Sequence, residues 1–269
     1  KNRLGVTMIS RRSLVIGSAA LMTLTPPDLE AAPGKSPQAM WDELLGRYVR
    51  PDSNGLNRVD YAAWKANAAD MRALDAVVAG LAGLKISALP KANQFATWAN
   101  LYNAITIQVV LARFPVKSIR DIKPSLLATG PWKEPRVRVE GKQLSLDDIE
   151  HGILRKQWRD PRVHYSVNCA SIGCPNLGRR GWRAETLDAD LDAAARAFIN
   201  SPRGVRVVGP QKLRVSSIYQ WFKVDFGNNE AGILTHLRRY AAPTLLAQMT
   251  NARILGDDYD WSINATSGS

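Results

Sequence analysis

Side chains that can act as nucleophiles, bases or soft metal ligands are few in this chain and gather in one segment. Both cysteines and two of the three histidines lie between His151 and Cys174. Glu150 adds a carboxylate directly before this segment. The third histidine, His236, is expected to be an ordinary helix residue. We therefore expect any chemical site of this chain to take its reactive groups from residues 150–174.

Thiol chemistry is the first interpretation of this segment. A neighbouring imidazole lowers the pKa of a cysteine, because it takes up the proton and stabilises the thiolate. Residues 163–168 alternate as a strand that carries His164 and ends just before Cys169. A tight turn could bring this pair together, with Glu150 or Asp160 holding the imidazole and Asn168 or a loop N–H stabilising an oxyanion. Such a set predicts a thiol-dependent hydrolase or acyl-transfer enzyme that acts on an amide or thioester-like bond.

A structural disulfide between Cys169 and Cys174 is the second interpretation. Two cysteines of an exported protein can oxidise to a disulfide. Closing so short a loop stabilises a fold by about 2 kcal/mol in the loop-entropy model, so the bond would hold only a local turn. The chain would then be a non-enzymatic, disulfide-stapled binding module.

A zinc site is the third interpretation, although no cofactor is required by the first two. His164, Cys169 and Cys174 supply three soft ligands, and His151 or Glu150 could be a fourth. Three protein ligands plus water describe a catalytic zinc ion, and four describe a structural one. The spacing is not that of a common zinc finger, and the sequence leaves all three interpretations open.

Two asparagines lie on an apolar helix predicted at residues 94–114. Buried amides must find hydrogen-bond partners. We therefore expect Asn100 and Asn103 to line the floor of the site or to tie down the cysteine-bearing loop. Tyr102, between them, is expected in the core or at the same floor.

An export signal is predicted at residues 1–32. The paired arginines Arg11-Arg12 follow a serine, an apolar run covers residues 14–24, and small residues stand at Ala31-Ala32. The run is too short to span a bilayer, which takes about 20 apolar residues. A twin-arginine signal is favoured over a general secretory one, so we expect a periplasmic or secreted protein. Residues 1–7, which precede Met8, are expected to be non-native.

The composition describes a basic chain of 269 residues with a net charge of +12. Such a surface attracts anionic partners, and an anionic envelope component is the candidate partner. The Lys and Arg residues are scattered along the sequence rather than run together. We therefore expect a solvated basic surface, no nucleic-acid partner and no transmembrane anchor.

The periodicity predicts one α+β domain at residues 33–269, rich in helix and with a small, mostly antiparallel sheet. Besides the helix and the strand named above, we expect helices at 37–48, 61–84, 146–157, 186–200, 218–221 and 230–249, hairpins at 137–141 and 205–215, and terminal strand pieces at 254–255 and 261–263.

Several short motifs stand in a fixed order along the chain. They occupy residues 59–61, 98–103, 114–119, 144–151, 160–164, 168–175, 217–222, 225–226 and 259–264. In this order they resemble the domain-of-unknown-function 547 family, from about residue 41 to residue 264. The biochemistry of that family is unsettled, so the resemblance implies that the His and Cys segment is a family hallmark and does not supply an activity. Family members also occur in reducing compartments, which argues against a purely disulfide role.

Overall fold

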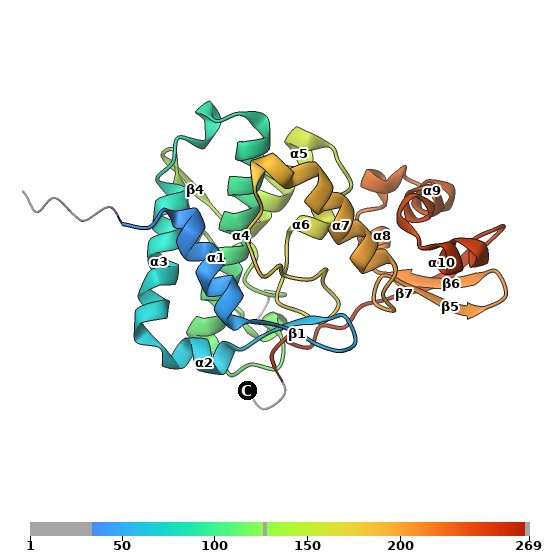
Figure 1. The fold of residues 1–269 in the computed structure, drawn as a ribbon, viewed down its shortest axis with the longest axis horizontal. Helices are drawn as coiled ribbons and strands as arrows, with labels where there is room; N and C mark the ends of the chain where they lie inside the picture. Colours follow the sequence, from blue (N-terminus) through green and yellow to red (C-terminus); the bar gives the residue numbers. More distant parts are fainter. Residues whose placement is uncertain (1–33, 126–127, 267–269) are drawn as a thin grey trace, which may run out of the picture. The chain divides into compact units, whose positions relative to one another are not determined.

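The structure is a computed structural model that describes residues 34–125 and 128–266 (Figure 1). The predicted export signal lies outside the described residues and stays a prediction. About 52% of the residues are helical, and the small sheets are mostly antiparallel. The α+β class with one helix-rich domain is therefore confirmed. Within the described ranges, no helix is long and apolar enough to cross a membrane.

The first half of the domain is mainly helical. Its strands form two short antiparallel hairpins, and its helices precede and follow the first of them. The elements are α1 (Pro37–Tyr48), β1 (Val49–Pro51), β2 (Asn57–Val59), α2 (Tyr61–Ala66), α3 (Ala68–Ala82), α4 (Lys91–Arg113), β3 (Val137–Val139) and β4 (Lys142–Leu144).

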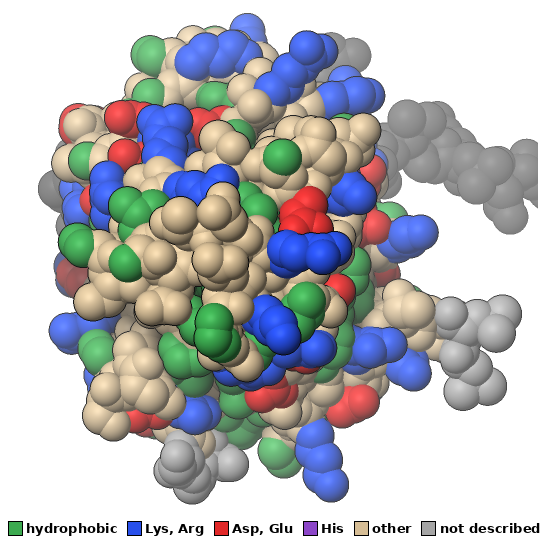
Figure 2. Space-filling model, turned by 90° about the vertical axis from the view of Figure 1, so that its right-hand side faces the viewer, with side chains coloured by type: hydrophobic (Ala, Val, Ile, Leu, Met, Phe, Trp, Pro, Cys, Tyr) green, Lys and Arg blue, Asp and Glu red, His purple; other side chains and the backbone are tan. Residues whose placement is uncertain are grey.

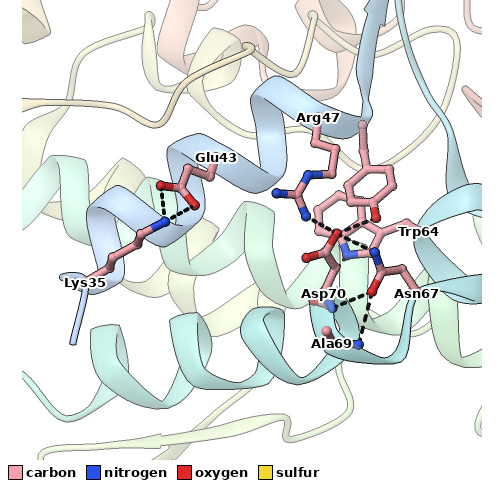
Figure 3. Close-up of polar contacts among 8 residues, drawn as sticks. Lys35, Glu43, Arg47, Trp64, Asn67, Ala69 and Asp70 are labelled. Carbon is pink, nitrogen blue, oxygen red and sulfur yellow. Dashed lines mark hydrogen bonds and ion pairs between the residues drawn. The ribbon is translucent and has the colours of Figure 1, made fainter. Parts of the chain in front are cut away.

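A buried carboxylate fastens α1 to α3 (Figure 3). Asp70, at the start of α3, accepts a hydrogen bond from the Tyr48 hydroxyl at 2.5 Å and an ion-paired bond from Arg47. Asn67, the N-cap of α3, donates to the same carboxylate at 3.1 Å. Because a buried charge is costly unless it is paired, these donors fix how the two helices pack.

Helix α4 is the centre of the larger hydrophobic core. Sixteen of its residues are buried, from Phe95 to Leu111, and α3 packs against it. A helix that is apolar around most of its circumference must be buried on most sides. The predicted central helix is confirmed, and it begins three residues earlier than expected.

The helix predicted at 146–157 forms, but its middle is a π-helix, Asp148–Leu154, which continues into α5 (Arg155–Trp158). Ser145 and Asp148 hold its start: Asp148 accepts from the Ser145 N–H at 2.9 Å and from the Ser145 hydroxyl at 2.6 Å, while the Asp148 N–H donates to the Ser145 hydroxyl at 3.1 Å. Such π-turns are frequent at functional sites.

The strand predicted at residues 163–168 is wrong, because Val163–Ser166 is a short helix, α6. The Asp160 carboxylate accepts the Arg162 N–H at 2.8 Å, and the Asp160 carbonyl then accepts the Val163 N–H at 3.1 Å, which starts a helical turn. All four residues of α6 are buried. Alternation identifies a strand only when one of its faces is exposed, so the pattern carried no such information here.

The second half builds a smaller core around a three-stranded sheet. Strands β5 and β6 form the predicted hairpin, and β7 pairs with β6 in parallel. The elements are α7 (Leu187–Ile199), β5 (Val205–Gly209), β6 (Lys212–Ser216), α8 (Ile218–Trp221), α9 (Glu230–Tyr240), α10 (Pro243–Gln248) and β7 (Arg253–Asp258). Figure 2 views the side of the domain that carries α9 and α10, where Lys and Arg side chains are scattered among other types.

After β7 the chain returns to the first half. The Ile172 N–H donates to the Ser262 carbonyl at 2.8 Å, and the Asn264 N–H donates to the Ala170 carbonyl at 3.0 Å. On its other side, the Asn264 carbonyl accepts the Val59 N–H at 2.8 Å. The C-terminal segment, residues 259–266, therefore lies between β2 and the loop that carries both cysteines.

Candidate active site

A pocket of about 180 Å³ lies where the two cores meet. It is lined by every residue that the sequence singled out in the His and Cys segment except Asp160 and Asn168, and also by Tyr102 of α4. These pocket residues are Glu150, His151, His164, Cys169, Cys174 and Tyr102. The fold thus brings the reactive groups of residues 150–174 to one cavity.

The two sulfurs are in direct contact. Both cysteines are free, and their Sγ atoms lie 2.7 Å apart, about 0.7 Å longer than a disulfide bond. Cys174 is buried, whereas Cys169 is half-buried. The Cys174 sulfur also accepts the backbone N–H of Cys169 at 3.0 Å.

Two hydroxyl groups complete the surroundings of the sulfurs. The Tyr259 hydroxyl lies 3.1 Å from each sulfur, and it donates to that of Cys174. The Ser171 hydroxyl lies 3.0 Å from the Cys169 sulfur and 2.8 Å from the Tyr259 oxygen. Burial, followed by the charge of the thiols, raises the pKa of Tyr259 well above its usual value. Its hydroxyl therefore keeps its proton at neutral pH and can donate it.

The two thiols differ in acidity. Burial raises the pKa of Cys174, but hydrogen bonds from Cys169, Tyr259 and the Cys169 N–H outweigh burial and lower it to about 7. Burial, together with the neighbouring sulfur of Cys174, raises the pKa of Cys169 well above its usual value. The pair therefore loses its first proton near pH 7, and the resulting charge lies mainly on Cys174.

The cysteine-bearing loop is shaped by Asn168. Its side-chain oxygen accepts the N–H of Ala170 at 2.8 Å, and its amide group donates to the Pro175 carbonyl at 2.7 Å. Ala170 has a left-handed φ of 62°, a conformation that costs energy in any residue with a Cβ. The Asn168 amide makes these two hydrogen bonds and does not line the pocket. It therefore positions the loop and is not placed to stabilise an oxyanion, the role that the sequence had suggested.

Neighbouring segments hold the same loop from two further sides. The Gly173 N–H donates to the Asp260 carbonyl at 2.8 Å, and a Cβ on Gly173 would lie 2.9 Å from the Asp260 nitrogen. Only glycine allows so close an approach. Behind the loop, Arg203 donates to the carbonyls of Ile172 and Cys174 and to Asn176. Its cation lies close enough to interact with the charge of Cys174.

His164 is held by a residue that the sequence interpretation did not select. Its Nε2 lies 2.7 Å from the Asp225 carboxylate, which also accepts from Arg155 at 2.6 Å. Burial opposes the charge of Asp225, but the bonds from His164 and Arg155 lower its pKa to about 2. An ionised carboxylate only accepts hydrogen bonds, so Nε2 carries a proton and Nδ1 is the nitrogen that can exchange one.

The predicted contact between His164 and Cys169 does not occur as a hydrogen bond among the described residues. The imidazole instead stacks on Phe222, with ring centroids 4.3 Å apart. Glu150 was expected to hold this imidazole, and Asp225 does so instead. The error has the same origin as the strand assigned to 163–168, because a helical α6 points His164 in a different direction from a strand.

The π-helix and the residue before it, Asp147, place two carboxylates and an imidazole on the pocket wall. His151 lies between them, with Nε2 3.9 Å from Asp147 and Nδ1 3.8 Å from Glu150. Arg155 lies 3.3 Å from Nδ1 of His151. His151 therefore has a carboxylate near each ring nitrogen and the Arg155 guanidinium beside Nδ1.

The asparagines of α4 bind loops and do not form the floor of the pocket. Asn103 donates to the Ser166 carbonyl at 2.9 Å and accepts the Asn168 N–H at 2.8 Å. Asn100 donates to the Trp182 carbonyl at 2.9 Å and accepts the Trp182 N–H at 2.8 Å. Of the three residues expected at the floor, only Tyr102 lines the pocket.

The zinc set predicted from the sequence has no counterpart in the described part of the chain. No group of three or more His, Cys, Asp or Glu side chains there is placed to hold a metal ion. His164 is engaged with Asp225, and the hydroxyl groups of Ser171 and Tyr259 contact the sulfurs. The zinc site expected from the sequence stays a prediction.

Two residues that contact the site were not among those predicted from the sequence. Asp225 and Tyr259 stand in the motifs at 225–226 and 259–264, which carry the family resemblance. Asp225 lies 61 residues after His164 in the sequence, and Tyr259 lies 85 residues after Cys174. Their presence in ordered motifs was the only sequence feature that could have selected them.

Residues 86–199 match the model of a family described as "Protein of unknown function, DUF547". The match supports this domain family for the chain. It runs from just before α4 to the end of α7, and so includes the π-helix, α6 and the cysteine-bearing loop. No curated protein and no solved structure matches the chain.

Proposed function

We propose that this protein is a thiol-dependent enzyme that hydrolyses or transfers the acyl group of an amide or thioester-like bond. The observation that carries the proposal is the cysteine pair, whose charge rests on Cys174 with a pKa of about 7. A pKa near the working pH gives a substantial thiolate population without losing nucleophilicity. The sequence favoured Cys169 as the nucleophile, and the difference in acidity favours Cys174.

The first half of the reaction is an attack on the substrate carbonyl. The Cys174 thiolate forms a C–S bond, and the π electron pair moves to the carbonyl oxygen. The Tyr259 hydroxyl, which already points at the sulfurs, is the donor proposed to stabilise this oxyanion. The tetrahedral adduct collapses when the bond to the leaving group breaks, and the leaving group takes the proton from Nδ1 of protonated His164.

The second half regenerates the thiolate. A water molecule gives a proton to Nδ1 of His164 while its oxygen attacks the thioester carbonyl. The C–S bond then breaks, the acid leaves and the Cys174 thiolate returns. Asp225 supports both halves because it keeps the Nε2 proton in place and stabilises the imidazolium, which is the role of the carboxylate in a triad.

An acyl-enzyme assay tests this proposal. Reduced protein is treated with p-nitrophenyl acetate, release of nitrophenolate is followed, and the acetylated peptide is found by mass spectrometry. We expect an acetyl group on Cys174 in the parent and none after Cys174→Ser, while Cys169→Ser keeps the adduct. His164→Ala should retain acetylation and slow deacylation. Acetylation of Cys169 would overturn the assignment to Cys174, and a parent that forms no adduct would refute acyl transfer.

Thiol–disulfide exchange is a second candidate, favoured by the distance of 2.7 Å between the sulfurs. In it, Cys174 would attack a substrate disulfide, and the Cys169 sulfur would then displace the substrate thiol. The substrate disulfide is reduced to two thiols, and the cysteine pair is oxidised to a disulfide. Incubation with oxidised glutathione tests this, because an exchange enzyme loses two hydrogens in mass and a hydrolase keeps both thiols through turnover.

A further inference from the structure

We propose that the pocket selects a ligand that carries an alkylammonium group, held by Asp147 and Glu150 and by a wall of tryptophans. That this ligand is a substrate rests on the proposed thiol chemistry. Its binding does not depend on that chemistry, because the carboxylates and rings that would hold the cation are distinct from the sulfurs.

The charge of the pocket is opposite to that of the chain. The sequence carries 36 Lys and Arg against 24 Asp and Glu, yet none of the described residues that line the pocket is a lysine or an arginine. Two carboxylates line it, those of Asp147 and Glu150. His151 lies between them. A cation entering this cavity therefore meets two carboxylates, and a carboxylate ligand would be repelled by them.

The walls are rings that attract cations. Trp221 stacks on Trp261 with centroids 5.5 Å apart, Trp132 meets Trp261 edge-on at 5.8 Å, and Tyr259 lies 4.8 Å from Trp221. All four line the pocket. Trp221 is 48% exposed, so core packing does not explain its place in the structure. An exposed indole at the mouth of a cavity is a common recognition element. The faces of such rings bind ammonium groups through their quadrupoles.

One neighbouring contact illustrates this preference. The Arg120 guanidinium lies 5.2 Å from the centre of the Trp261 ring, although Arg120 does not line the pocket. The Trp261 ring at the edge of this wall therefore already contacts a cation that lies outside the pocket. Inside the pocket, a cation that contacts these rings would have to belong to a ligand.

The size of the cavity limits the ligand. A volume of about 180 Å³ is below the usual range for drug-sized molecules, so it fits an ammonium headgroup with a short alkyl chain. The bond to be attacked would lie at the other end of that chain, next to the sulfurs. The substrate class is thus an acyl compound with an amine or ammonium group a few carbons from the carbonyl.

Binding is tested with n-pentylammonium, n-pentanol and n-pentanoate, which match in length and differ in charge. Tryptophan fluorescence reports binding, because three indoles line the pocket. We expect the ammonium to bind at least about tenfold more tightly than the alcohol, which is about 1.4 kcal/mol, and the pentanoate not to bind. Equal affinities for the three probes would overturn the inference.

Variants show whether the pocket is responsible. Glu150→Gln, Asp147→Asn and Trp221→Ala should each weaken ammonium binding about tenfold or more. Glu43→Gln is the matched control, because this exposed carboxylate pairs with Lys35 (Figure 3) and is not part of the pocket wall. This variant should not change binding. Trp221→Ala keeps the test informative if a carboxylate variant does not fold, since its side chain is half exposed. Unchanged binding in a folded Trp221→Ala protein would refute the site.

The two proposals can fail separately. If pentylammonium binds but no acyl-enzyme forms, the cation site is supported and the proposal of a thiol enzyme is refuted. If Cys174 is acetylated but the three probes bind alike, the thiol enzyme is supported and the cation site is refuted.

Discussion

Replacing Tyr259 by phenylalanine removes one hydroxyl and leaves the ring. That hydroxyl lies 3.1 Å from both sulfurs and donates to Cys174. A hydrogen bond to a charged acceptor contributes about 1.5–3 kcal/mol, which corresponds to about 1–2 pKa units. We therefore expect the pKa of Cys174 to rise from about 7 to about 8 or higher in Tyr259→Phe.

The effect on reactivity follows from the thiolate fraction. At pH 7 the parent should be about half thiolate, and a rise of about one unit leaves roughly a tenth. Alkylation by iodoacetamide at pH 7 should then slow about fivefold or more, because only the thiolate reacts. At pH well above 9 the two proteins should react at similar rates. The assay is the alkylation rate of reduced protein against pH, with the modified cysteine identified by peptide mass.

Tyr165→Phe is the matched control. Its hydroxyl is also buried and bonded, to Tyr219 at 3.2 Å and His236 at 2.7 Å, but it does not touch a sulfur. This variant should keep the alkylation profile of the parent. A parent with an alkylation pKa near the unperturbed value of about 8.5, or a Tyr259→Phe profile equal to that of the parent, would refute the account of the thiolate given above.

Four further predictions concern the residues that position the cysteine-bearing loop and His164, and the predicted export signal. Gly173→Ala should lower the Tm and slow alkylation, because its Cβ would lie 2.9 Å from the backbone of the C-terminal segment; Gly152→Ala, with nothing within 4 Å, should do neither. Asn103→Ala should lower the free energy of unfolding in urea by about 1–3 kcal/mol, because a buried N–H and a buried carbonyl lose their partner. The lowered pKa of Asp225, about 2 against 3.8, means that its stabilisation is present above pH 3.8 and lost as the pH falls towards 2. The Tm difference between the parent and Asp225→Asn should therefore vanish over that range. Replacing the arginine pair 11–12 by lysines should abolish export through a twin-arginine pathway.

Each of these has a contradicting result. An unchanged Tm and alkylation rate in Gly173→Ala would show that the loop does not need its close contact with the C-terminal segment. An unchanged urea midpoint in Asn103→Ala would remove α4 as an anchor of the loop. A constant Tm difference for Asp225→Asn between pH 6 and 2 would contradict its lowered pKa. Continued export of the double-lysine protein would leave only a general secretory signal.

The sequence predicted the composition of the site better than its geometry. The grouping of His164, Cys169 and Cys174 was visible because reactive side chains are rare in this chain and stand close together. Their mutual placement was not visible, because α6 is buried on all sides and its alternating pattern looks like a strand. A single element of the wrong type was enough to assign the imidazole to Glu150.

The long-range partners could not be predicted from spacing. Asp225 and Tyr259 reach the site from the second half of the chain, and an aspartate beside a phenylalanine or a tyrosine beside an aspartate has many ordinary uses in turns and cores. The fold class needed no such information, since helix periodicity and hairpin motifs are local. Features that depend on local sequence were therefore predicted, whereas the site partners that depend on tertiary contacts were not.

The residues that contact the thiols and His164 extend beyond the part of the chain that matches the family model. The match ends at residue 199, whereas the hydroxyl that stabilises the thiolate and the carboxylate that orients His164 belong to Tyr259 and Asp225. The loop between the cysteines also takes its backbone partners from residues 260–264. A thiol pair inside residues 86–199 would therefore lack the donor that lowers its pKa and the carboxylate that holds its base in place. The chemistry proposed for the pocket requires the C-terminal segment to be folded against the loop, so the catalytic unit is the whole domain rather than the matched region.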